Sequence, residues 1–300
     1  MKANNKQLTF KSLLQWYLIL IGSFLMVSVV IWLCCVYVLR VFSISDFSTF
    51  ANNQLSQGIY LYVIVGFVAQ LIDGTLGMAY GVSSTSFLIT TGVSPAVASA
   101  SVHASEVFTT GISGLSHWRF RNVDKKLFIK LSIAGSVGAI LGAYVLSSFD
   151  GDMIKPYITI YLLLMGIRII FKVIKKKVQK KEFKYHSILG FIGGFVDASG
   201  GGGWGPVVTT TLIGTGKEPK LTIGSVNAAE FLVTIASSSI FTMMIGLTHW
   251  NIIIGMLLGG MLAAPLAAFL CHKINSRVAM VLVGLLIIGL SIRTLVKMWF

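Results

Sequence analysis

Charged side chains are scarce in this sequence of 300 residues. Asp, Glu, Lys and Arg together make up 11% of the chain, whereas 55% of the residues are hydrophobic. A soluble domain carries about a quarter charged residues, because its surface must interact with water. The composition therefore excludes an ordinary soluble domain and indicates a chain that mostly faces lipid or other helices.

Acidic residues are the rarer charged type, with ten against 24 Lys and Arg, so the net charge is +14. In a soluble protein this excess would indicate nucleic-acid binding. Here the basic residues lie mainly in short loops between apolar spans, where they determine membrane topology. We therefore expect no nucleic-acid partner.

Cysteine is also rare. Cys34, Cys35 and Cys271 lie in or at the ends of apolar spans, without CxxC or Cys/His ligand spacing. This pattern supports neither a disulfide framework nor a zinc site. We expect no metal and no cofactor.

Long apolar runs are abundant, and several reach the roughly 20 residues that a helix needs to cross a bilayer core. The first run follows three lysines like a signal peptide, but it exceeds the usual length of about 7 to 15 residues and ends without a small-residue cleavage site. We therefore expect a retained N-terminal anchor helix in an all-α, multi-pass membrane protein. The clearest runs are Trp16 to Leu39, Leu127 to Leu146, Met153 to Phe171, Ile252 to Leu270 and Val278 to Met298.

The chain contains one unit twice. Residues from Gly66 onward match those from Gly190 onward at a constant offset, and the match includes Asp, Gly, Pro and Glu, which chance apolar similarity would not align. We expect an N-terminal helix with an external loop (1–57), a first membrane repeat (58–174), a basic cytoplasmic linker (175–184) and a second repeat (185–300). Matched pairs include Asp73/Asp197, Gly77/Gly201, Pro95/Pro219, Glu106/Glu230 and, after a one-residue insertion, Arg168/Arg293.

The basic loops predict the topology. Arg119 to Lys130 and Lys172 to Lys184 are rich in Lys and Arg and should be cytoplasmic, as should the N-terminus, whereas the loop at Asp150 should be external. When the spans are counted from these loops, the two repeats have opposite orientations in the membrane, provided that each glycine-rich break re-enters rather than crossing the membrane once. Inverted repeats with interrupted helices are typical of secondary transporters.

Four of the ten acidic residues lie inside apolar segments, as the repeat pairs Asp73/Asp197 and Glu106/Glu230. A charge at a membrane helix centre costs about 2.5 to 3.5 kcal/mol, so such residues usually have a function. Asp73 and Asp197 are interpreted as structural or capping residues of broken helices. Glu106 and Glu230 lie mid-span and suit proton coupling. His103 shares a helix face with Glu106, which makes a proton relay one interpretation, although a lone intramembrane histidine is more often simply hydrogen-bonded.

The segment Asp197 to Pro206 should break a helix, because Gly costs about 1 kcal/mol and Pro about 3 kcal/mol relative to Ala. Backbone at membrane depth must line a cavity or be buried in protein. A helix that restarts at Pro206 would present free N–H groups to an oxyanion. A formal GxGxxG match here has no preceding strand and is not a dinucleotide site.

The first-repeat counterpart, Asp73 to Gly81, keeps two of the glycines, and close packing of small residues is its competing interpretation. We expect a small anion to bind between the two breaks. The expected binding residues are Thr75, Gly77, Ser199, Gly200, Gly201, Gly202, Gly203, Trp204, Gly205 and Asn227.

The segment Gly190 to Pro206, its weaker echo in the first repeat and Ser225-Val-Asn227 resemble the sulfite exporter TauE/SafE family. The resemblance spans about Ile59 to Met298, and the first repeat departs from the glycine-rich pattern at Leu76, Met78 and Ala79. It implies export of sulfite, an organosulfonate or a related carboxylate across the bacterial plasma membrane. The expected partners are this anion, protons and the lipid bilayer. The sequence leaves open whether the chain forms a homodimer.

Four other functions compete with anion export by a transporter. A passive anion channel would need a continuous polar path, and uptake rather than export is a second alternative. An intramembrane enzyme is disfavoured because no GxSxG or HExxH motif is present. A structural or sensory subunit is disfavoured by the paired intramembrane acids.

Overall fold

The computed structural model describes residues 58–174, 183–270 and 276–299, and these ranges contain helices and connecting turns but no strand. Residues from Gly58 onward form one compact unit. The N-terminal span Trp16 to Leu39, the three cysteines and most of the basic linker lie outside the described residues.

The same order of elements occurs twice. A helix that ends early, a short second helix and three long helices form each repeat, and Pro95 and Pro219 begin the first long helix of each. The first repeat comprises α3 (Ile59–Leu76), α4 (Tyr80–Thr90), α5 (Pro95–Arg119), α6 (Lys125–Ser148) and α7 (Gly151–Ile174). The second comprises α8 (His186–Gly200), the π-helical turn η1 (Gly205–Thr209), α9 (Thr210–Gly214), α10 (Pro219–Met244), α11 (Trp250–Leu270) and α12 (Ser276–Trp299).

Six of the described helices, α3, α6, α7, α10, α11 and α12, are long and apolar enough to cross a membrane. The prediction of an all-α, multi-pass membrane protein is therefore confirmed. The four apolar runs predicted within the described ranges all lie inside α6, α7, α11 and α12.

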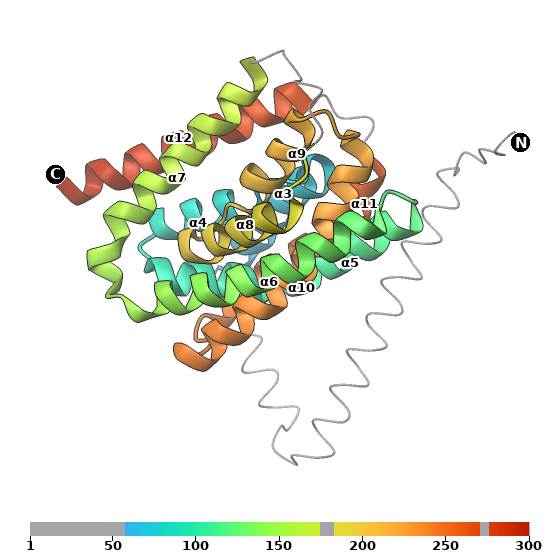
Figure 1. Cartoon of the computed structure of the whole chain (residues 1–300). Helices are drawn as coiled ribbons and strands as arrows, with labels where there is room; N and C mark the ends of the chain where they lie inside the picture. Colours follow the sequence, from blue (N-terminus) through green and yellow to red (C-terminus); the bar gives the residue numbers. More distant parts are fainter. Residues whose placement is uncertain (1–57, 175–182, 271–275, 300) are drawn as a thin grey trace, which may run out of the picture. The chain divides into compact units, whose positions relative to one another are not determined.

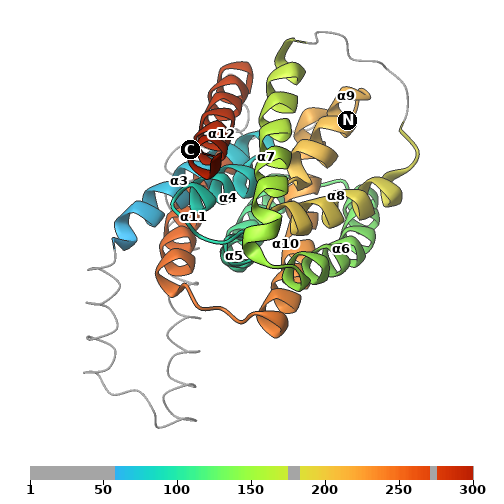
Figure 2. The same cartoon turned by 90° about the vertical axis from the view of Figure 1, so that its left-hand side faces the viewer.

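The two repeats exchange their contacts. Helix α6 packs on α8 and α11 packs on α3, while α5 packs on α10 and α7 on α12, as Figures 1 and 2 show for α6 with α8 and α7 with α12. Glycines allow the exchanged helices to approach closely: a Cβ on Gly138 would collide with the carbonyl oxygen of Phe191, and one on Gly259 with that of Val63. Small residues commonly permit such packing in membrane proteins.

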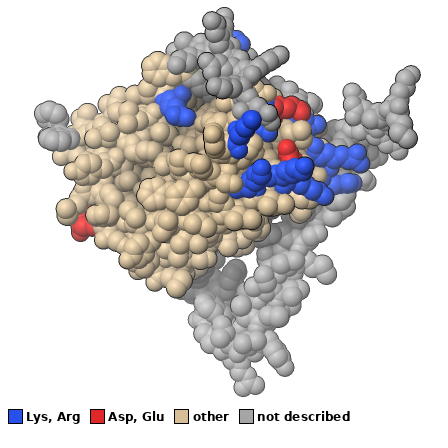
Figure 3. Space-filling model, in the orientation of Figure 1, with Lys and Arg blue, Asp and Glu red and all other residues tan. Residues whose placement is uncertain are grey.

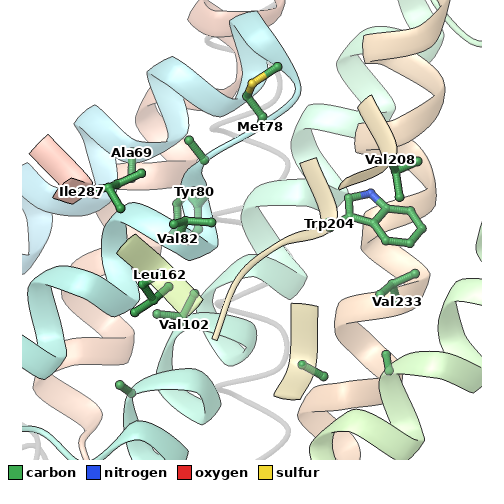
Figure 4. Packing of buried hydrophobic residues seen from close by; sticks show 14 of the residues in the cluster. Ala69, Met78, Tyr80, Val82, Val102, Leu162, Trp204, Val208, Val233 and Ile287 are labelled. Atoms are coloured by element: carbon green, nitrogen blue, oxygen red, sulfur yellow. The ribbon is translucent and has the colours of Figure 1, made fainter. Parts of the chain in front are cut away.

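The buried core surrounds the ends of the broken helices. Trp204 is fully buried between Val208 and Val233 (Figure 4), and its indole N–H donates to the carbonyl of Val226 at 3.2 Å. The outward face of α6 is apolar instead, with Ile133 67% exposed. In Figure 3, Lys and Arg gather towards one end of the visible face and most of the remaining visible surface is uncharged. This distribution suits a lipid-facing surface.

Candidate functional site

Each repeat contains a helix interrupted at the glycines singled out in the sequence. Helix α3 ends before Gly77, which has a φ of 66°, and α8 ends before Gly201 and Gly202, with φ values of 72° and 139°. Glycine adopts these positive angles without steric cost. Ala79 also has a positive φ, of 92°, which is unusual for a residue with a side chain and marks the first break as strained.

The two breaks touch each other. A Cβ added to Gly202 would collide with the backbone nitrogen of Val82, and one added to Gly81 would lie 2.9 Å from the Cα of Gly202. A Cβ on Gly205 would likewise collide with the backbone of Gly77 and Met78. The backbones of the two repeats therefore cross in direct contact, and only glycine permits this approach.

Asp197 organises the second break. Its Oδ1 accepts hydrogen bonds from the N–H groups of Gly203 at 2.8 Å and Trp204 at 2.9 Å. Its carbonyl accepts from the N–H groups of Gly201 and Gly202. The expectation that these N–H groups are free for an anion is wrong in this arrangement, because the carboxyl that ends α8 reaches over to the start of the next helix.

Asp73 has the same place in the first break with fewer partners. It accepts a hydrogen bond from the backbone N–H of Tyr80, the counterpart of Trp204, and its carbonyl accepts from Gly77. Its Oδ2 is buried and has no hydrogen-bond partner among the described residues. The first break is therefore capped less completely than the second.

His103 connects the repeats. Its Nε2 lies 3.1 Å from Oδ2 of Asp197, and its Nδ1 lies 2.8 Å from the carbonyl oxygen of Ser99. The hydroxyl of Ser99 donates to the carbonyl of Ala198 at 3.2 Å. Two side chains of α5 therefore hold the end of α8, a contact that the spacing of His103 and Glu106 did not reveal.

Four acids and one histidine form a buried cluster at the crossing. Asp73, Glu106, Asp197 and Glu230 are 1%, 1%, 2% and 4% exposed and interact electrostatically with one another. One atom each of His103, Glu106 and Asp197 lie within 4.8 Å of one another, close enough to share a cation. Glu106 Oε2 has no hydrogen-bond partner within the described ranges. No Lys or Arg of those ranges forms an ion pair with these acids.

The other polar side chains expected to bind the anion lie on three different helices. The hydroxyl of Thr75 donates to carbonyls of α3, that of Ser199 donates to Phe195, and the amide of Asn227 donates to Ile223 and accepts from Ser113. Their hydrogen bonds stay mostly within their own helices. A role in substrate binding remains a prediction for these residues and for the glycines.

Two residues of α7 at the second break were missed in the sequence. The Tyr161 hydroxyl donates to the carbonyl of Gly202 at 2.6 Å, and Nε of Arg168 lies 3.3 Å from the carbonyl oxygen of Pro206. The repeat offered a signal for Arg168, which matches Arg293. Arg293 lines a cavity of about 110 Å³ together with Thr90, Lys155 and Lys297.

The comparisons with known proteins agree with the fold. The model of the family "Sulfite exporter TauE/SafE" matches residues 61–294. The "Probable membrane transporter protein YtnM" of Bacillus subtilis (strain 168) is 45% identical over 250 residues, covering 80% of this chain and 83% of the relative. The "Probable membrane transporter protein YunE" of the same organism is 20% identical over 262 residues, covering 76% and 94%. No solved structure matches the chain.

Proposed function

The chain belongs to the sulfite exporter TauE/SafE family of membrane transporters, and from this premise we propose that it exports a small anion in a proton-coupled manner. The anion is sulfite, an organosulfonate or a related carboxylate, and the membrane is the bacterial plasma membrane. The observation that carries the proposal is the crossing of two broken helices, one from each repeat, inside a cluster of buried acids. Interrupted helices that meet between repeats are the usual sites of secondary transporters.

The proposal includes inverted repeats with re-entrant breaks. The exchanged packing of α6 with α8 and α11 with α3 supports an internal two-fold relation. The segments after the breaks are too short to cross a core of about 30 Å by themselves, since α4 has 11 residues and η1 and α9 have five each. We propose that they re-enter the membrane rather than complete one crossing with the helix before the break. Rocking one repeat against the other would then expose the crossing alternately to the two sides.

The positively charged side chains that could bind an anion lie beside the breaks rather than within the acidic cluster. Arg168 contacts the carbonyl of Pro206 in the second break. Its repeat counterpart Arg293 shares a cavity with Lys155 and Lys297 next to the end of α4. Guanidinium groups bind oxyanions strongly. This pair of arginines supports an anionic substrate.

The acidic cluster supports protons as the coupling ion. Four carboxyl groups in one low-dielectric interior cannot all remain charged without counterions. The cluster must therefore bind cations, and Glu106, Glu230 and His103 are the residues proposed to exchange protons during transport.

Thermal stabilisation of the purified protein identifies the anion, because only a ligand that binds the native state raises its stability. The panel comprises sulfite, sulfonates, sulfate and carboxylates at equal ionic strength. Flux of the stabilising anion is then measured in proteoliposomes. Saturation and counterflow are expected for a transporter, whereas unsaturable flux without counterflow would show the channel alternative to be correct.

A further inference from the structure

We propose that a proton shared between His103 and Asp197 takes part in coupling, together with the proton exchange at Glu106 and Glu230 proposed above, and that it fastens α5 of the first repeat to the broken end of α8 in the second. The coupling role rests on the proposed function above. The presence of the shared proton rests on hydrogen-bond geometry alone.

The two ring nitrogens of His103 face acceptors. The carbonyl of Ser99, 2.8 Å from Nδ1, can only accept, and the Ser99 hydroxyl, 3.3 Å from Nδ1, donates its one hydrogen to the carbonyl of Ala198. We therefore assign a hydrogen to Nδ1. A neutral ring would then direct the lone pair of Nε2 at Oδ2 of Asp197, 3.1 Å away. A carboxylate oxygen is also an acceptor, and two acceptors at this distance require a proton between them.

Of the two carboxyl oxygens of Asp197, Oδ2 is the one that is available for this proton. Oδ1 already accepts from Gly203 and Trp204 at the start of the second half-helix. Proton loss would leave Nε2 and Oδ2 facing each other as two acceptors, and the contact between α5 and α8 would have to open. The state of one proton therefore biases the movement of the two repeats against each other.

The surroundings of the pair contain acids but no basic partner from the described residues. The ring of His103 also packs on Phe241, with centroids 5.6 Å apart, which holds its orientation. The titratable groups that interact with Asp197 of the pair are Glu106 of α5, Asp73 of α3, Tyr161 of α7 and Glu230 of α10. Tyr80 of α4 interacts with Glu106 and Asp73, and Arg168 of α7 interacts with Tyr161.

The second repeat has no such pair. The counterpart of His103 is Asn227, whose amide bonds to Ile223 and Ser113, and Oδ2 of Asp73 has no hydrogen-bond partner in the described ranges. An amide does not take up a proton near neutral pH. Of the two positions that the sequence repeat makes equivalent, only the one with His103 and Asp197 can hold the shared proton.

The chain suggests two informative substitutions. In Asp197→Asn, the amide oxygen still accepts from Gly203 and Trp204, and the amide N–H₂ donates permanently to Nε2 of His103. In His103→Asn, the first repeat receives the side chain that the second repeat uses at this position. Asp150→Asn, in the turn after α6, is the matched control because its carboxyl only caps backbone N–H groups there.

Nitrogen NMR of ¹⁵N-histidine in nanodiscs tests for the shared proton without any transported anion. His103→Asn identifies the signal. We expect the Nε2 signal of His103 to move with pH in the wild type and in Asp150→Asn, and to stay constant in Asp197→Asn. An identical response in wild type and Asp197→Asn would overturn the proposal. So would a signal that responds to Na⁺ or Zn²⁺ at constant pH, since the site would then hold a metal ion.

Sulfite flux in proteoliposomes tests the coupling role. We expect an imposed pH difference to accelerate flux in the wild type and Asp150→Asn, but not in Asp197→Asn or His103→Asn, with thermal unfolding in nanodiscs as the check that each variant is folded. If both variants keep the full acceleration, the coupling proton is bound elsewhere and the inference is wrong. If the wild type moves no sulfite, the proposed function fails for that anion, and the NMR result still decides whether the shared proton exists.

Discussion

Gly202→Ala perturbs the crossing at its closest point. The residue has a φ of 139°, and an added Cβ would collide with the backbone of Val82 and lie within van der Waals overlap of Gly81. Both neighbours are backbone atoms of the other repeat, which cannot rotate away as a side chain would. The variant can therefore form only if the two breaks separate or the local backbone changes.

Two terms contribute to the cost. Overpacking a close-packed interior destabilises by about 1 to 3 kcal/mol, and holding a non-glycine residue in a sparsely populated backbone region costs about 1 to 3 kcal/mol more. The sum of about 2 to 6 kcal/mol corresponds to about 30-fold to 10⁴-fold in the folding equilibrium, at about 1.4 kcal/mol per tenfold. This is a large part of the usual stability of about 5 to 15 kcal/mol.

The assay is thermal unfolding in nanodiscs, with transport measured in parallel. Gly214→Ala is the matched control, because Gly214 lies in the same broken segment, is exposed and has no atom within 4 Å of an added Cβ. At about 2 to 4 °C per kcal/mol for a domain of about this size, Gly202→Ala should lower Tm by at least about 4 °C. Gly214→Ala should leave Tm unchanged or raise it slightly. A Gly202→Ala protein with the Tm and flux of the wild type would refute the backbone crossing described here.

Three further predictions test other parts of the molecule. Glu106→Gln and Glu230→Gln remove a titratable proton with little change in shape, so each should retain anion binding but lose acceleration by a pH gradient; full gradient-driven flux in both would show that they are structural. Tyr161→Phe removes the hydrogen bond to the second break and should destabilise by about 0.6 to 1.7 kcal/mol, whereas the exposed Tyr157→Phe should not, as thermal unfolding will show. A cysteine at Gln179, outside the described residues, should resist an impermeant thiol reagent in intact cells, and rapid labelling would contradict the predicted topology.

The helical architecture was largely predictable because its causes are local. Apolar length predicted four long helices, and the structure extends the run Leu127 to Leu146 only to Lys125–Ser148. Glycine and proline costs predicted interruptions, which occur at Gly77 and Gly201. The register between the repeats needed no structural information, since Asp, Pro and Glu recur at equivalent positions.

The partners across the repeats were not predictable in this way. Helical spacing placed His103 beside Glu106, but its nearest acidic partner is Asp197, which another helix supplies. The N–H groups of the second break were expected to be free because periodicity cannot show where the Asp197 side chain folds back. Tyr161 offered no signal at all, since its repeat counterpart is Leu286.

The exchanged packing has a consequence for biogenesis. Because α11 covers α3 and α6 covers α8, the first repeat emerges from the ribosome before the helix that packs most extensively on its broken helix. Buried polar residues of α3, such as Gln70 and Asp73, have no permanent protein cover until the second repeat has been inserted. The final packing of the first half therefore depends on the arrival of the second half.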